Sequence, residues 1–140
     1  MKTSTPLLRL LSSIALLAAF VVSAHAADST GWAGEYRDDK YLNGRAVFQL
    51  TIEQSGSAMQ VSFDAAWVDA HGAAPEAQGP AKVSGNTLTF TFTDSFDNSG
   101  SGTITRKGND IIVSLNPTHV VEPRCLGFYG KNFRLKRVVK

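Results

Sequence analysis

Residues that could carry out catalysis are few in this sequence and lie far apart. Nucleophilic hydrolysis needs a serine or cysteine beside a base, and a third group must orient that base. His119 and Cys125 are six residues apart in one proline-containing stretch, and the apolar neighbours of Cys125 favour a buried, unreactive thiol. Residues 98–102 (Asn-Ser-Gly-Ser-Gly) resemble a nucleophile elbow in composition, but they fall in a strand-to-strand turn. We therefore expect no catalytic residues and no enzymatic activity.

Metal ligands show no better pattern. His71, His119 and the single cysteine lack the close paired spacing of zinc sites. Asp94, Asp97 and Asn98 could supply oxygen ligands, but the full calcium-binding loop with its terminal glutamate is absent. Glycine loops that bind phosphate are absent as well. The sequence therefore predicts a protein with no metal and no cofactor.

The first 26 residues follow the plan of a secretory signal peptide. Lys2 and Arg9 give a positively charged start. An apolar run of 13 residues, Leu10 to Val22, follows, and Ala24-His25-Ala26 matches a small-x-small cleavage site. A membrane-spanning helix needs about 20 apolar residues, so the run is too short for an anchor. We expect a signal peptide over residues 1–26 with cleavage after Ala26, a periplasmic or secreted product without a membrane span, and one domain over residues 27–140.

Removal of this segment changes the charge of the chain. The full 140-residue sequence has a formal net charge of +2, but residues 27–140 hold twelve cations and twelve acids and are neutral. A neutral domain lacks the excess positive charge on which general nucleic-acid binding depends, so we expect no nucleic-acid partner. Within the domain, residues 27–123 carry a net charge of −6 and residues 124–140 a net charge of +6.

The positive charge gathers at the C-terminal end, where Arg134, Lys136 and Lys140 share one face of an expected strand. Two interpretations are open. In the first, the cations neutralise the acidic remainder of the domain and protect the strand from aggregation. In the second, they form a docking surface for an anionic partner.

Cys125 is the single cysteine of the chain, so no internal disulfide can form. In an oxidising compartment it is a small buried apolar residue, a thiol that bridges two chains, or a modified thiol. Without a disulfide, the 114 residues of the expected domain must be stabilised by their hydrophobic core, and that length is sufficient for one.

Hydrophobic residues alternate with polar ones through most of the domain, which is typical of half-buried strands. In residues 87–93, for example, one leucine and two phenylalanines alternate with four threonines. Asn43-Gly44, Ser55-Gly56-Ser57, Gly85-Asn86 and Gly108-Asn109 are turn sequences typical of hairpins. The pattern predicts strands at residues 33–41, 45–54, 59–68, 80–84, 87–94, 101–107, 110–115 and 127–139.

Eight consecutive strands joined mostly by short turns predict an all-β fold, an eight-stranded antiparallel up-and-down (meander) β-barrel, because closure removes exposed strand edges. A two-sheet sandwich is the main alternative, but it needs crossing connections that are longer than most of these turns. Two longer connections, residues 68–79 and 116–126, are the places for a lid or a partner contact.

The two ends of the expected domain carry distinctive clusters. It opens with Gly31-Trp32-Ala33-Gly34-Glu35-Tyr36 and closes with the basic strand Asn132-Phe133-Arg134-Leu135-Lys136. This plan resembles the lipocalin-like and avidin-like small barrels, in which an N-terminal tryptophan packs at the closed end beneath a basic residue from the last strand. The resemblance implies a structural cation–π contact between Trp32 and Arg134 or Arg137.

Aromatic side chains fall largely at inward positions of the expected barrel. They either fill the interior or line a ligand cavity. If a cavity exists, we expect Phe63, Trp67 and Phe90 to line it, with Trp67 beside a mouth formed by residues 68–79. The first functional hypothesis is therefore a non-enzymatic exported binding module for a small apolar or aromatic ligand.

The second hypothesis is a protein-interaction module. Small periplasmic barrels of this size include inhibitors of cell-wall-degrading enzymes such as lysozyme, which insert a loop into the cleft of the enzyme. Glu122 or Asp97 on a projecting loop could offer a carboxylate to a basic enzyme of that class.

Overall fold

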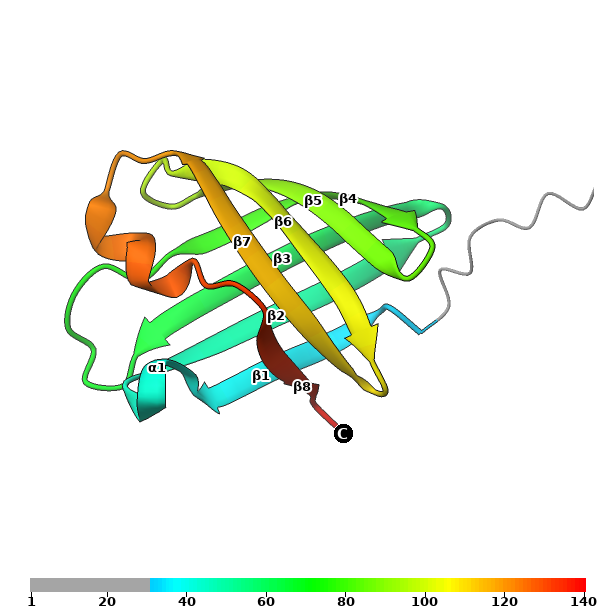
Figure 1. Cartoon of the computed structure of the whole chain (residues 1–140), viewed down its shortest axis with the longest axis horizontal. Coiled ribbons are helices and arrows are strands. Elements are labelled where there is room, and N and C mark those ends of the chain that lie inside the picture. Colours follow the sequence, from blue (N-terminus) through cyan, green and yellow to red (C-terminus); the bar gives the residue numbers. More distant parts are fainter. Residues whose placement is uncertain (1–30) are drawn as a thin grey trace, which may run out of the picture.

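The computed structural model describes residues 31–140, and the expected signal peptide lies outside the described residues. Eight antiparallel strands form a closed barrel in which each strand pairs with its neighbours in sequence and β1 pairs with β8 (Figure 1). The expected all-β meander barrel is therefore confirmed. The elements in chain order are β1 (Gly34–Lys40), α1 (Tyr41–Gly44), β2 (Ala46–Ser55), β3 (Ala58–Trp67), β4 (Glu76–Ser84), β5 (Thr87–Asp94), β6 (Ser99–Lys107), β7 (Asp110–His119), the 3-10 helix η1 (Pro123–Phe128) and β8 (Phe133–Arg137).

Strand boundaries differ from the expected ones at the longer connections. β4 begins at Glu76 rather than at residue 80, because its pairing with β3 continues as far as Asp64. β7 extends to His119, which pairs with Ser99 of β6. β8 is confined to five residues because η1 occupies the start of the expected strand. A proline opens η1, and the Glu122 side chain accepts a hydrogen bond from a backbone N–H of its first turn, which are two features that start a helix.

One end of the barrel carries tight turns and the other carries longer connections (Figure 1). The hairpins β2–β3, β4–β5 and β6–β7 each turn through two residues. Gly56, Gly85 and Gly108 supply the positive φ of 61°, 60° and 61° at the first position of these turns. We call this the tight-turn end. The opposite end, the loop end, carries residues 41–45, 68–75, 95–98 and 120–132.

Asn43-Gly44 does not form the two-residue hairpin that the sequence predicts. Leu42, Asn43 and Gly44 have φ values of 54°, 59° and 81° and together form the short turn α1, across which Tyr41 pairs with Ala46. A leucine is costly in the left-handed region. Packing of the Leu42 side chain against the core offsets that cost.

Inward-facing side chains fill the barrel with one core. Aromatic rings make up much of its loop-end half. Phe63 stacks on Phe48 with ring centroids 5.5 Å apart and meets the edge of Phe92 at 5.3 Å. Tyr129, which follows η1, stacks on Phe92 at 5.5 Å. Ring packing of this kind stabilises the core beyond its buried area.

The segment before β8 completes the barrel where that strand is too short. β8 pairs with three residues of β7 and two of β1. Towards the loop end, the Tyr41 ring packs against Phe133 at 5.1 Å and against Phe128 at 6.2 Å. The Tyr41 hydroxyl donates to the Phe128 carbonyl at 2.9 Å, and the Leu115 N–H donates to the Gly130 carbonyl at 2.9 Å.

The cation above Trp32 comes from a different strand than the resemblance implies. Trp32 is fully buried at the tight-turn end, and the Arg106 guanidinium of β6 lies 4.3 Å from the centre of its ring. Arg134 lies elsewhere, in an ion pair with Asp110. The expected cation–π contact of Trp32 with Arg134 or Arg137 is thus corrected. Arg106 shares the inward phase of Gly102 and Ile104, which directs its side chain towards the interior.

Arg137 fastens the same end through a different set of contacts. Its guanidinium lies 4.9 Å from the centre of the Tyr36 ring. It donates to the Gly31 and Ala33 carbonyls at 2.6 and 3.0 Å and to the Tyr36 hydroxyl at 2.6 Å. That hydroxyl donates in turn to the Trp32 carbonyl at 2.8 Å. The Arg137 side chain of the last strand therefore holds the backbone on both sides of Trp32 in place.

Candidate functional site

The three aromatic residues expected to line a cavity are packed into the protein at separate places. Phe63 is 2% exposed and lies among other rings, as described above. The Phe90 ring lies so close to Gly102 that a Cβ there would come within 2.3 Å of it. Trp67 meets the edge of Phe128 at 4.8 Å and donates its indole N–H to the Ala73 carbonyl at 3.0 Å. Phe63 and Phe90 both contact the Phe92 ring, whereas Trp67 contacts Phe128, so the three side chains pack against other residues and do not line one shared cavity.

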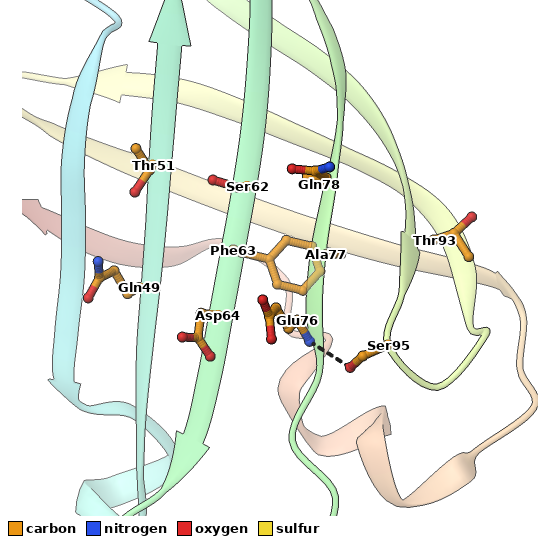
Figure 2. A pocket seen from close by; sticks show the side chains of 10 residues that line it. All are labelled: Gln49, Thr51, Ser62, Phe63, Asp64, Glu76, Ala77, Gln78, Thr93 and Ser95. Atoms are coloured by element: carbon orange, nitrogen blue, oxygen red, sulfur yellow. Dashed lines mark hydrogen bonds between the residues drawn. The ribbon is translucent and has the colours of Figure 1, made fainter.

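A groove of 540 Å³ crosses the outer surface of β2, β3, β4 and β5 (Figure 2). Most of its lining residues stand at the outward positions of these strands, and the inward-facing Phe63 and Ala77 lie between them. The alternation that turns Leu50 and Phe63 inward turns their neighbours outward, so the sequence pattern itself places polar side chains here.

The first row of polar side chains in the groove is uncharged. Thr51 pairs with Ser62, Ser62 with Gln78, and Gln78 with Thr93, so four adjacent strands each contribute one residue in register. We call these four residues the neutral row. Figure 2 shows Thr51, Ser62 and Gln78 side by side across their strands. Thr51, Ser62 and Thr93 offer hydroxyl groups and Gln78 an amide, and both groups can donate and accept hydrogen bonds.

The second row lies beside the first, nearer the loop end, and carries negative charge (Figure 2). Gln49 pairs with Asp64, and Asp64 pairs with Glu76. Ser95 extends the row, and its hydroxyl oxygen accepts the Glu76 backbone N–H at 3.2 Å. We call Gln49, Asp64, Glu76 and Ser95 the acidic row. Residues of both rows line the groove.

The charges in the groove have one sign. No lysine or arginine is among the residues that line it. Within residues 31–140, Asp64 and Glu76 have no ion-pair partner. Neutral side chains around them are held in place: the Gln49 amide donates to Glu35 at 3.0 Å, and the Gln60 amide donates to Gln78 at 3.0 Å. The groove therefore suits ligands that offer hydroxyl or amine donors and repels anions.

Two further hollows adjoin the groove, and Gln78 contributes to both. One of 380 Å³ continues over β4 to β7 and is lined by Thr93, Ser99 and Thr118. The other, of 830 Å³, extends towards the tight-turn end and includes Ile52, Met59 and Pro80 among its apolar lining. Gln78 is thus the point at which three hollows of the outer surface meet.

A buried polar network fastens the segment after β7 to the β5–β6 turn. Asp94 accepts hydrogen bonds from the backbone and side-chain N–H groups of Asn98 at 3.0 and 2.9 Å and from the Tyr129 hydroxyl. The side-chain Oδ1 of Asn98 accepts the backbone N–H groups of Val121 and Glu122, each at 2.8 Å. We call Asp94 and Asn98 the loop-end clamp. Its polar atoms are bonded within the protein, which makes it a structural feature rather than a ligand site.

Cys125 is fully buried beside this clamp. Burial raises the pKa of its thiol to about 11, and the charges of Asp94 and Glu122 add to the rise. A thiol in this state is unreactive and inaccessible to a second chain. The structure therefore favours the buried apolar residue over an intermolecular bridge. His119 is exposed at the end of β7 whereas Cys125 is buried, so the two side chains do not form a reactive thiol–imidazole pair.

The expected cationic surface is largely neutralised by neighbouring acids. Arg134 pairs with Asp110 at 2.7 Å, and Lys140 pairs with Glu35 at 3.1 Å. Hydrogen bonds from Arg134 hold the pKa of Asp110 below its ordinary value. Lys136 lies opposite another cation, Arg37, on β1. Charge compensation within the domain therefore explains these cations better than docking of an anionic partner.

Among residues 31–140, no group of three or more histidine, cysteine, aspartate or glutamate side chains converges as metal ligands would. No helix within the same residues has both the length and the apolar character needed to cross a membrane.

Local sequence patterns do not reveal the groove, because most of its residues come from four strands and become neighbours only through strand register. The signal available in the sequence is the polar, outward phase of each strand, which by itself predicts only a solvent-facing surface. Comparison with known proteins adds no assignment, since no family model, curated protein or solved structure matches the chain.

Proposed function

We propose that this protein is a non-enzymatic binding module whose outer groove takes a polyhydroxylated ligand, of the kind that sugars represent. The observation that carries the proposal is the pair of cross-strand rows of hydroxyl, amide and carboxylate groups that line one groove. Hydroxyl groups of a ligand both donate and accept hydrogen bonds, so each finds a partner in the neutral row. Their donors also find acceptors in the carboxylates of Asp64 and Glu76.

The charge of the groove supports an uncharged ligand over an anionic one. Two carboxylates face each other without a cation between them, and an added negative charge would be repelled at short range. An uncharged polyol instead stabilises both carboxylates through hydrogen bonds, which are stronger to charged acceptors than to neutral ones. The scarcity of nucleophile–base pairs in the described residues supports binding without catalysis.

The earlier hypothesis of a small apolar or aromatic ligand stays a prediction, and its place on the protein changes. The interior positions of Phe63, Trp67 and Phe90 are filled by packing. The hollow that suits an apolar ligand is the one with Ile52 and Met59 in its lining. Export through a cleaved signal peptide remains part of the proposal and is tested by N-terminal sequencing of the mature protein, with Ala27 expected first.

Two measurements test the proposal. The first is isothermal titration calorimetry with neutral sugars, and the second is retention of the protein on immobilised neutral polysaccharides. Gln78→Ala removes the side chain shared by the three hollows, and Lys82→Ala is the matched control, since Lys82 also faces outward on β4 but lines none of them. Loss of two or more hydrogen bonds predicts a decrease in affinity of about tenfold or more for Gln78→Ala. Equal binding by the two variants, or no binding of any neutral sugar, would contradict the proposal.

A second candidate function, inhibition of a basic cell-wall-degrading enzyme, is favoured by one observation. Asp97 is exposed at the tip of the β5–β6 turn, and no side-chain bond to its carboxylate exists within residues 31–140. The Glu122 carboxylate is instead bound by Arg124 at 2.8 and 2.9 Å, which lowers its pKa to about 2. Asp97 is therefore better placed than Glu122 to offer a carboxylate to a basic enzyme. Lysozyme activity measured with added protein tests the idea, and Asp97→Asn should then remove any inhibition.

A further inference from the structure

The neutral row continues beyond the groove. Thr93 pairs with Ser99 of β6, so the register of side chains runs from Thr51 through Ser62, Gln78 and Thr93 to Ser99. Neighbouring strands lie about 4.8 Å apart, so the four residues of the groove span about 14 Å and the five residues about 19 Å along the sheet. A single sugar ring is smaller than that span.

The hollows along the row adjoin each other. The groove and the 380 Å³ hollow share Gln78 and Thr93 among their lining residues, so the two hollows lie side by side at these residues. The smaller hollow exists where glycines face neighbouring strands closely. A Cβ at Gly79 would lie 1.7 Å from the Thr91 carbonyl oxygen, and a Cβ at Gly100 would lie 2.2 Å from that of Asn116. The absence of a Cβ at these positions lets the neighbouring strands approach this closely.

The hydroxyl groups along this path are free to bind a ligand. Within residues 31–140, no hydrogen bond joins the Thr51, Thr93 or Ser62 hydroxyl to another protein group, whereas the hydroxyl of Thr118 donates to the Ser99 carbonyl at 3.4 Å. Threonine is common in strands for reasons of packing alone. Packing does not, however, explain why the row lies in a hollow, or why no charged residue interrupts it from β2 to β6.

We propose that the ligand is an extended, uncharged polysaccharide chain that lies across the strands along the row from Thr51 to Ser99. This inference rests on the proposed function and adds the length, direction and charge of the ligand. Each strand then offers one hydrogen-bonding side chain to successive parts of the chain. Asp64 and Glu76 flank the row on one side and exclude chains that carry carboxylate or sulfate groups.

The experiment measures affinity as a function of chain length. Cello-, malto- and chito-oligosaccharides of one to six units are titrated into the protein by calorimetry, with oligogalacturonate as the anionic counterpart. We expect the affinity for one of the neutral series to rise by about tenfold or more from one unit to four, because each added unit gains a hydrogen bond or more, and then to level off. The anionic series should bind more weakly than a neutral series of equal length.

Two variants of the same strand locate the chain. Thr93→Lys places a long cation in the row, whereas Thr89→Lys makes the same change at an outward position of β5 that lines none of the hollows. Both substitutions change the intrinsic strand propensity by the same amount. A difference in ligand affinity between the two variants therefore reports the path of the ligand. Thr93→Lys should lower the affinity for the four-unit chain by about tenfold or more, and Thr89→Lys should change it by less than about twofold.

The outcomes distinguish the extended-chain inference from the proposed sugar-binding function. Affinity that is equal for one unit and for four, with Gln78→Ala still deleterious, overturns the extended chain and leaves the sugar-binding groove. Equal effects of Thr93→Lys and Thr89→Lys overturn the path along the row. Failure of every oligosaccharide to bind overturns the proposed function and the inference together.

Discussion

Asp64 and Glu76 occupy directly opposed positions on β3 and β4, and neither carboxylate has a cationic partner within residues 31–140. Like charges placed directly opposite each other destabilise an antiparallel pair. A lysine at either position would form a cross-strand ion pair instead. A pair that weakens the free protein is expected where a ligand or partner makes use of it.

The repulsion predicts that Asp64→Asn stabilises the ligand-free protein. Removing one of the two charges should raise the free energy of unfolding by about 0.5 kcal/mol, as measured by urea denaturation at pH 7. Glu53→Gln is the control, because it also removes one exposed acid but from a position that faces Gln60 rather than another carboxylate. Added salt should reduce the difference between Asp64→Asn and the parent protein, since ions screen exposed charges. Destabilisation by Asp64→Asn would show that the pair is not repulsive.

Two arginines of β8 should differ sharply in their contribution to stability. Arg137 bonds the backbone of residues 31 and 33 and the Tyr36 hydroxyl, whereas Arg134 makes an exposed ion pair with Asp110. Arg137→Ala should lower the free energy of unfolding by about 2 kcal/mol because several charge-assisted hydrogen bonds are lost together. Arg134→Ala should cost less than about 1 kcal/mol. The measurement is thermal and urea unfolding of both variants, and equal losses would contradict the assigned role of Arg137.

The meander itself was readable from the sequence because hydrophobic alternation and hairpin glycines act locally. Residues 87–93 illustrate this, since Leu88, Phe90 and Phe92 are all buried as their phase predicts. The cation above Trp32 is also consistent with strand phase, because Arg106 lies at an inward position of β6. The resemblance to lipocalin-like barrels instead implies a cation from the last strand, and that expectation is wrong here.

The groove could not be read in the same way. Ser62 and Gln78 face each other only because residues 68–75 return the chain in one particular register, and no local pattern fixes that register. A shift of one residue would turn Gln78 inward and Ala77 outward, so the burial of Ala77 and Gly79 against the core is what selects it. Information of this kind lies in packing between strands rather than within them.

Asn98 should be the most sensitive polar residue of the loop end. Asn98→Ala removes two acceptor bonds to the segment after β7 and one donor to the buried Asp94 carboxylate. We expect a loss of about 3 kcal/mol in the free energy of unfolding, because buried polar groups are left without partners. The variant should also expose Cys125 more often, since that residue follows the released segment. Thiol labelling with a chromogenic disulfide under native conditions measures this exposure.

A matched variant separates the clamp from general instability. Arg124→Ala breaks the exposed pair with Glu122 in the same segment and leaves Asn98 bonded. Its labelling rate should stay close to that of the parent protein, whereas Asn98→Ala should label about tenfold faster or more. Equal rates for the two variants would show that the clamp does not hold the segment.

Alkaline pH should lower the free energy of unfolding as the buried thiol and tyrosine hydroxyl groups lose their protons. Burial raises the pKa of Cys125 from 9.0 to about 11 and that of Tyr41 from 10.0 to about 12. Both groups are neutral when protonated, and the folded state keeps the proton to a higher pH than the unfolded state does. Their contribution to stability is therefore complete below pH 9 and is lost progressively as pH rises through the folded pKa values.

Cys125→Ala isolates the first of these steps. In the parent protein, the thiol should lower the free energy of unfolding by about 1 kcal/mol between pH 8 and pH 10, and the buried tyrosines, which begin to ionise in the unfolded state over the same interval, should add a loss of similar size. In Cys125→Ala, that slope should fall by about half, even if the loss of the buried sulfur lowers stability at every pH. Urea denaturation at intervals of half a pH unit measures both. A slope of the same size in the variant would show that the thiol is not buried in the folded protein, or that another group titrates in its place.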